Sequence, residues 1–217
     1  MTDSLLDIVD EVTTADLVDS MGRLHRHRCH LLDLVTPTPG RRLFGPAVTI
    51  SYFPACSAAL DPGQYNFGSL FLEAVGNQSA GKVLVLASNG HSDTSLAGGT
   101  KLSRGHNLEL AGVLADGRLR DFDELAGYRF STYCRGEATR WGGDVVTPFQ
   151  ANVPVVIDGV GIRPGDYIHA DSSGAVAIPA AEVRSVLKGA VAVVREDEGY
   201  LATIKEESRG RPPLDQR

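Results

Sequence analysis

The sequence has few of the features that mark secreted, membrane-spanning or nucleic-acid-binding proteins. Its 217 residues contain only three cysteines, Cys29, Cys56 and Cys134, an odd and scattered set that does not suit a disulfide framework. No apolar run approaches the length of a membrane span, and the polar N-terminus does not resemble a secretory signal. With 21 basic against 27 acidic residues, an electrostatic nucleic-acid binder is also disfavoured. We therefore expect a cytoplasmic protein with no membrane and no nucleic acid among its partners.

The composition that is present is that of an ordinary globular domain. Hydrophobic residues make up 42% of the chain and charged residues 22%, which excludes a disordered protein. The 24 glycines indicate many turns and close backbone approaches. Since neither a repeat nor a linker interrupts the chain, we predict one domain at residues 1–207 and a disordered tail at 208–217.

Hydrophobic patterning predicts an α/β fold in which part of the sheet is parallel. Residues 82–87 and 112–115 are continuous apolar runs of strand length, as expected for strands buried on both faces. A glycine-rich loop and a helical pattern at residues 100–110 lie between them. A strand, loop, helix and strand in this order form a unit whose two strands run parallel.

The second half of the chain predicts short antiparallel strands followed by one long helix. Asp158-Gly159 lies between two β-branched runs, which is a strong hairpin signal. From Ala180 to about Ile204, apolar residues recur at helical spacing and form one stripe, which we expect to lie in the core, alone or completed by a neighbouring subunit. Mixed sheets are therefore expected.

Two loops are candidates for a binding site, because ligands of parallel α/β sheets bind beyond the carboxyl ends of the strands. In the first, Gly98 and Gly99 precede the predicted helix, whose exposed N–H groups would favour a carboxylate or phosphate. In the second, Arg120 and Asp121 place a carboxylate-binding guanidinium beside a metal ligand. Both features also occur in ordinary turns, but together they suit a small anionic substrate chelated to a divalent ion.

Several segments together make the chain resemble the RraA-like family, which includes 4-hydroxy-4-methyl-2-oxoglutarate aldolases. In chain order these segments are residues 14–22, 45–49, 112–121, 152–155, 163–166 and 170–179. The resemblance implies a swivelling β/β/α-like fold assembled as a homotrimer or hexamer. It also implies an aldolase or decarboxylase that converts a small anionic 2-oxo acid to pyruvate through an enolate stabilised by Mg²⁺ or Mn²⁺.

The resemblance further implies roles for particular residues. Arg120 would hold the carboxylate or carbonyl of the substrate, and Asp121 would bind the metal. The loop from Gly98 to Lys101 would offer N–H groups to the substrate carboxylate, and Glu124 also fits the family pattern.

Part of the implied site would come from a second subunit. A glutamate on the C-terminal helix of the neighbouring subunit supports the waters of the metal in this family. Glu196 and Glu198 lie in the corresponding region of the chain. The resemblance therefore places the sites at subunit interfaces.

One position departs from the family pattern. The aldolases carry an acid 20 intervening residues before the arginine, and this chain has Gly99 there, followed by Thr100 and Lys101. Either His91, Asp93 or Lys101 replaces that acid, or the reaction is different. Lys101 could bind a second anion or act as a base or Schiff-base amine, but an exposed helix lysine is the more ordinary interpretation.

Two further features have plainer interpretations. The tract from His25 to His30 contains good zinc ligands, but the flanking arginines and the lack of a second cluster favour a surface or interface loop. Tyr133 and Trp141 are expected in the core or at a subunit interface.

Three functions therefore compete. The first is a divalent-metal-dependent lyase for a small 2-oxo acid. The second is a related enzyme whose altered site, with Gly99 and Lys101, serves another substrate in a specialised biosynthetic pathway. The third is a non-enzymatic, ribonuclease-regulator-like protein, which the presence of Asp121 makes less favourable.

Overall fold

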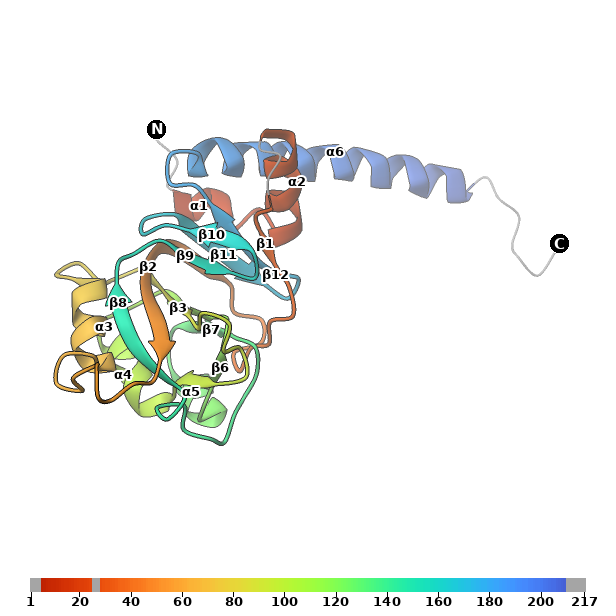
Figure 1. The fold of residues 1–217 in the computed structure, drawn as a ribbon. Coiled ribbons are helices and arrows are strands. Elements are labelled where there is room, and N and C mark those ends of the chain that lie inside the picture. Colours follow the sequence, from red (N-terminus) through yellow and green to blue (C-terminus); the bar gives the residue numbers. More distant parts are fainter. Residues whose placement is uncertain (1–4, 25–27, 210–217) are drawn as a thin grey trace. The chain divides into compact units, whose positions relative to one another are not determined.

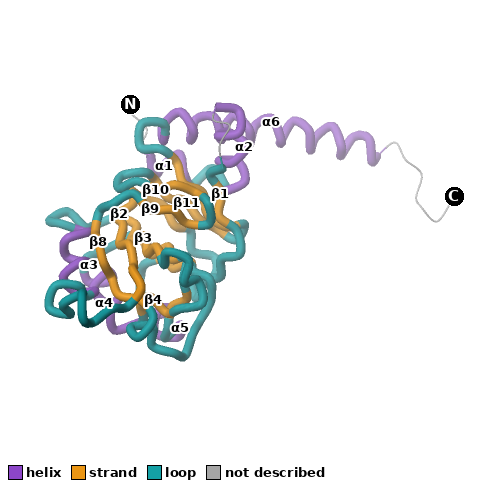
Figure 2. The backbone as a smooth tube through the Cα atoms, in the orientation of Figure 1, coloured by secondary structure: helices purple, strands orange, loops and turns teal. Residues whose placement is uncertain are grey.

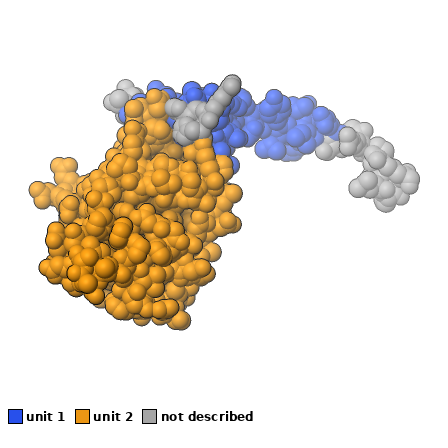
Figure 3. All heavy atoms as spheres, in the orientation of Figure 1, with its two compact units in different colours: residues 1–26, 184–217 blue, residues 27–183 orange. Residues whose placement is uncertain are grey.

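The computed structural model describes residues 5–24 and 28–209, in two compact units (Figure 1). One unit comprises residues 1–26 and 184–217, and the other residues 27–183; Figure 3 shows them in different colours. The predicted tail at 208–217 lies outside the described residues from 210 onward.

The larger unit contains every described strand and is built around a mixed sheet. Seven strands follow the order β1-β12-β11-β2-β3-β5-β7, and β8 pairs with β2 (Figures 1 and 2). The pairs β2·β3, β3·β5 and β5·β7 are parallel and the others antiparallel, which confirms the predicted α/β class with a mixed sheet. The strands are β1 His30–Leu31, β2 Leu43–Pro54, β3 Val83–Ala87, β5 Gly112–Ala115, β7 Ser131–Tyr133, β8 Val146–Ala151, β11 Tyr167–Asp171 and β12 Gly174–Ile178.

Strand β3 shows why the apolar runs are continuous. All five of its residues are buried. Leu84 and Leu86 belong to one core cluster, while Val83 and Val85 belong to a second, because successive side chains of a strand point to opposite faces. The first cluster includes residues of the helices α3 Phe67–Val75, α4 Gly99–Asn107 and α5 Phe122–Gly127. Both faces of the sheet are thus covered.

The predicted hairpin is present as β9 Val155–Ile157 and β10 Val160–Ile162. Asp158 and Gly159, its two central residues, have φ of 50° and 76°. Positive φ at both positions is what a type I′ turn requires.

A second pair of strands was not predicted. β4 Ser95–Ala97 and β6 Arg118–Leu119 form a separate, parallel two-stranded sheet. Each strand is only two or three residues long, within a stretch that the sequence presents as loop. Such short segments carry too few residues for a hydrophobic period.

The smaller unit consists of α1 Leu5–Val9, α2 Thr14–Leu24 and α6 Val183–Arg209. The Ser20 hydroxyl on α2 donates to the carbonyl of Val186 on α6 at 2.8 Å. Gly189 permits this packing, since a Cβ there would lie 2.3 Å from Ser20 Oγ. Among the described residues, no helix is long and apolar enough to cross a membrane.

The long C-terminal helix is confirmed, but its start differs from the prediction. It begins at Val183 rather than Ala180, because the N–H of Ala180 donates to Asp166 Oδ1 at 3.1 Å and holds the preceding residues in a turn. Its apolar stripe was expected in the core, alone or completed by a neighbouring subunit. Within this chain Leu201 and Ile204 are 65% and 55% exposed, and their burial by a second subunit stays a prediction.

Candidate functional site

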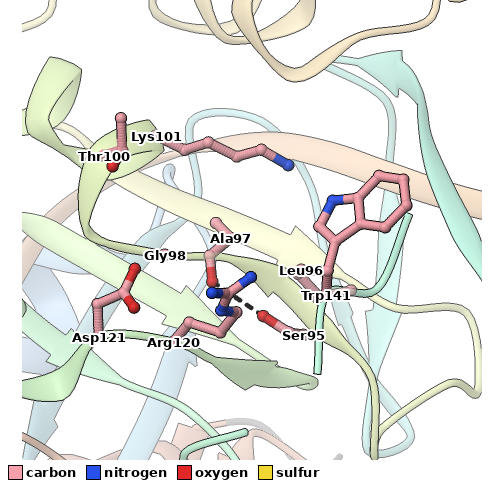
Figure 4. A pocket seen from close by; sticks show the side chains of 9 residues that line it. All are labelled: Ser95, Leu96, Ala97, Gly98, Thr100, Lys101, Arg120, Asp121 and Trp141. Carbon is pink, nitrogen blue, oxygen red and sulfur yellow. Dashed lines mark hydrogen bonds between the residues drawn. The ribbon is translucent and has the colours of Figure 1, made fainter. Parts of the chain in front are cut away.

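The β4·β6 pair brings two distant loops together. Because the strands are parallel, their carboxyl ends lie at the same edge, where Gly98 follows β4 and Arg120 follows β6. The N–H of Arg120 donates to the carbonyl of Ala97 at 3.0 Å and aligns the two segments. Figure 4 shows the resulting group of side chains.

Asp121 has a backbone conformation that directs its carboxylate toward the glycine loop. Its φ is 64°, in the left-handed region that aspartate tolerates better than most residues. Asp121 Oδ2 accepts a hydrogen bond from the N–H of Gly99 at 3.0 Å, and a Cβ at Gly98 would lie 2.6 Å from the same oxygen. Glu137 caps α5 instead, by accepting from the N–H of Phe122 at 2.9 Å. The Asp121 carboxylate therefore does not cap α5 and instead accepts from the first residue of α4.

A cavity of about 180 Å³, here called the anion pocket, forms at this edge. The sequence predicted five of its lining residues as site residues, and the structure brings them together. The lining comprises Ser95, Leu96, Ala97, Gly98, Thr100, Lys101, Arg120, Asp121 and Trp141. Gly99 contributes its N–H to Asp121 and is buried.

Trp141 was expected in the core or at a subunit interface. It is 60% exposed and lines the anion pocket, so it is not in the core of this chain, and an interface role stays a prediction. Two glycines follow it. A Cβ at Gly142 would lie 2.1 Å from the carbonyl oxygen of Ser95, so only glycine lets this turn approach β4 so closely. A lone tryptophan before a glycine pair was the sequence signal that could have identified it. Tyr133, in contrast, is buried as expected.

Lys101 gives the anion pocket its second cation. Figure 4 shows its side chain extending from α4 toward the indole of Trp141, above Arg120. Its ammonium lies 5.6 Å from the centre of the Phe67 ring. Burial, followed by repulsion from Arg120 and Arg104, lowers the pKa of Lys101 below its usual value. Two close cations that repel one another are a suitable receptor for an anion.

Glu124 fills the space beside Gly99. A Cβ built on Gly99 would lie 1.9 Å from Glu124 Oε2. The Tyr128 hydroxyl donates to Glu124 Oε1 at 2.6 Å. Desolvation, with the Glu124 and Asp121 carboxylates nearby, raises the pKa of Tyr128 to about 12, so this hydroxyl keeps its proton. A carboxylate thus stands where a side chain at residue 99 would extend.

Of the three residues predicted as replacements for the missing acid, the structure brings Lys101 to the anion pocket but not His91 or Asp93. Neither His91 nor Asp93 is among the described residues that line the anion pocket. The Asp93 side chain is 93% exposed, and Arg118 lies 3.5 Å from it.

The two helix glutamates lie in the smaller unit. Glu196 accepts hydrogen bonds from both terminal nitrogens of Arg23, at 3.1 and 2.9 Å, so its carboxylate is paired within its own chain. This pairing lowers the pKa of Glu196. Glu198 lies on the same helix and is exposed. Their predicted role toward a neighbouring subunit stays a prediction.

The donor set of the pocket fits Mg²⁺ or Mn²⁺ better than zinc. Within residues 5–24 and 28–209, no three His, Cys, Asp or Glu side chains form a ready-made metal site. Mg²⁺ is usually held by one or two carboxylates, with waters and substrate oxygens completing its shell. Asp121 supplies such a carboxylate. Of the predicted surface tract at His25–His30, residues 25–27 lie outside the described part of the chain.

Comparisons with known proteins match the chain to one family. The family description RraA-like: Aldolase/RraA matches residues 14–177. A protein of Halalkalibacterium halodurans named "Putative 4-hydroxy-4-methyl-2-oxoglutarate aldolase" is 33% identical over 135 residues, or 62% of this chain and 64% of that protein. A protein of Burkholderia mallei with the same name is 32% identical over 164 residues, or 74% of this chain and 92% of that protein. The chain thus spans less than two thirds of the length of the first relative.

A solved structure shows the same fold. Streptomyces coelicolor RraAS2, described as an unusual member of the RNase ES inhibitor RraA protein family, aligns with a TM-score of 0.77. The alignment covers 93% of this chain and 97% of that chain at 23% identity. At this identity the likeness concerns the fold alone.

Proposed function

The chain belongs to the Aldolase/RraA family, and we propose that it is a divalent-metal-dependent lyase that cleaves the C3–C4 bond of a small 2-oxo acid. One observation carries the proposal: Arg120, Asp121 and Lys101 line the same pocket. The two cationic side chains can bind an anionic substrate, and the carboxylate beside them can bind a divalent metal ion. The names of the two relatives support the same class of reaction.

The charges of the pocket match the charge that the reaction develops. When oxaloacetate loses carbon dioxide, the C3–C4 bond breaks, its electron pair enters the enolate of pyruvate, and a proton is then taken up at C3. The Arg120 guanidinium is suited to hold the carboxylate through two parallel hydrogen bonds, and the Lys101 ammonium adds charge beside it. A divalent ion at Asp121 supplies, when bound, further positive charge for the enolate.

Glu124 does not line the anion pocket, but it is the carboxylate beside the position at which the family carries its acid. Its Oε2 stands in the space that such a side chain would enter, and Tyr128 fixes its Oε1. From this position the carboxylate can hold a water or a proton near Asp121. Because the family pattern has a glutamate at position 124 as well, the change to Gly99 leaves Glu124 as the carboxylate nearest to that position.

Pyruvate release from oxaloacetate and from 4-hydroxy-4-methyl-2-oxoglutarate tests the function. We expect release above the rate without protein, dependent on Mg²⁺ or Mn²⁺ and abolished by chelator. Arg120→Lys, which keeps the charge but loses the planar fork, should lower kcat/KM by about 10²-fold. Asp121→Asn should weaken Mn²⁺ binding, measured by calorimetry, while Arg129→Lys, an exposed change elsewhere, should change neither. Unchanged turnover in both site variants would refute the proposal.

A further inference from the structure

A larger cavity, of about 460 Å³, adjoins the anion pocket. The two share Ser95, Leu96, Lys101 and Trp141 as lining residues. The anion pocket alone, at about 180 Å³, is smaller than the roughly 300–1,000 Å³ of typical ligand sites. The adjoining cavity alone falls within that range, so the site has room for much more than a three-carbon acid.

The lining of this second space, here called the apolar cavity, differs in chemistry from the anion pocket. Tyr65, Phe67 and Trp141 contribute aromatic rings, and Leu60 and Val146 contribute aliphatic side chains. Among the described residues that line it, Lys101 is the only charged one. An occupant is therefore expected to be uncharged and to bury apolar surface.

Lys101 stands at the junction between the two spaces. Its side chain lines both, and its ammonium lies over the ring of Phe67, which is itself 4% exposed and faces the apolar cavity. A carboxylate placed between Arg120 and Lys101 would therefore leave the rest of its molecule at the opening of the apolar cavity. Because the two cavities share lining residues, a substrate bound in the anion pocket would extend into the apolar cavity.

We propose that the substrate is a 4-hydroxy-2-oxo acid whose fourth carbon carries an apolar, ring-sized group, with its acid end at Arg120 and Asp121 and the ring in the apolar cavity. The inference rests on the proposed lyase function and names its substrate class. In the reaction the C3–C4 bond breaks and its electron pair forms the pyruvate enolate. The C4 hydroxyl loses its proton, an aryl aldehyde leaves, and a proton is taken up at C3.

Two acids that cannot be cleaved test the binding. 2-Oxo-4-phenylbutanoate and 2-oxobutanoate share the 2-oxo acid end and differ by a phenyl ring. Burial of the ring should make the former bind at least about tenfold more tightly, measured by titration calorimetry with Mn²⁺ present. With 4-hydroxy-2-oxo-4-phenylbutanoate, the protein should release benzaldehyde and pyruvate in equal amounts.

A pair of neighbouring exposed residues provides matched variants. Ser57 lines the apolar cavity, and Ala58, next in the chain and also exposed, does not. Ser57→Trp should remove most of the advantage of the phenyl acid and leave the affinity for 2-oxobutanoate unchanged. Ala58→Trp should preserve both affinities.

The outcomes separate this inference from the function on which it rests. Equal affinities for the two acids, or a Ser57→Trp variant that keeps the preference, would overturn the substrate class while leaving the lyase proposal intact. If neither acid binds to the folded, Mn²⁺-loaded protein, the 2-oxo acid site itself is refuted, and the inference with it.

Discussion

The carboxylate of Glu124 occupies the space that a side chain on Gly99 would enter. A Cβ at residue 99 would lie 1.9 Å from Glu124 Oε2, a separation that no pair of non-bonded atoms tolerates. A side chain at residue 99 would therefore displace the Glu124 carboxylate, which is exposed, from its present place beside Tyr128.

This close approach predicts what happens when the carboxylate is moved from residue 124 to residue 99. Glu124→Ala should lower kcat/KM for oxaloacetate by about 10²-fold, the usual contribution of a positioned acid or base. Gly99→Asp alone should move the Glu124 side chain away from Tyr128, because the new Cβ meets the existing carboxylate. The double variant Gly99→Asp/Glu124→Ala should recover much of the activity, since the space is then open to the aspartate.

The control for the exchange is the double variant Gly99→Ala/Glu124→Ala, which fills the space without a carboxylate. Thermal unfolding of each variant distinguishes lost chemistry from lost structure. Equal activity in the two double variants would show that the carboxylate is not required there.

Lys101 should give substrate affinity an unusual pH dependence. Burial and the neighbouring arginines lower its pKa, so its ammonium loses the proton at a lower pH than an ordinary lysine does. KM for oxaloacetate should therefore rise in the alkaline range, before an unperturbed lysine would titrate near 10.5. Lys101→Arg should keep KM flat over the same range, and KM profiles from pH 7 to 10 provide the measurement.

His169 should make the fold acid-sensitive. Burial lowers its pKa from 6.5 to about 4, so between these values the unfolded chain binds a proton that the folded protein does not. Stability should be lost as the pH falls through this window, by on the order of 3 kcal/mol in total. Urea unfolding at pH 7, 5.5 and 4.5 measures the slope. His169→Phe should flatten it, and an unchanged slope would contradict the assignment.

The sheet should not tolerate a methyl group at Gly112. A Cβ there would lie 2.3 Å from both Leu43 Cδ1 and the carbonyl oxygen of Ser131. Gly112→Ala should cost about 1–3 kcal/mol of unfolding free energy, as overpacking does. Gly161→Ala is the matched control in another strand, since a Cβ there would meet no atom within 4 Å. Equal stability of the two variants would contradict the packing described.

The parts of the fold that sequence predicts best are those with long or distinctive patterns. The buried runs at β3 and β5, the Asp158-Gly159 turn and the C-terminal helix all appear close to their expected positions. β4 and β6 do not, because parallel pairing between short segments depends on contacts far apart in the chain. The exposure of the last turns of the α6 stripe likewise depends on which elements pack against the helix. The periodicity of the sequence does not report this.

The sequence predicted only those site residues that belong to a recognisable motif. The pairing of β4 with β6 explains why Arg120, Asp121 and Lys101, which are apart in sequence, line one pocket. Trp141 was missed because its approach depends on the space left by Gly142. The place of Glu124 beside Gly99 depends on how α5 faces α4, which no local pattern reports. Oligomeric state and the ribonuclease-regulator hypothesis stay predictions.

The left-handed backbone at Asp121 limits the replacements that natural variation can use there. Only glycine, asparagine and aspartate adopt φ near 64° at little cost. A related sequence with asparagine or glycine at this position would therefore keep the backbone of the loop while losing the carboxylate that we propose binds the metal.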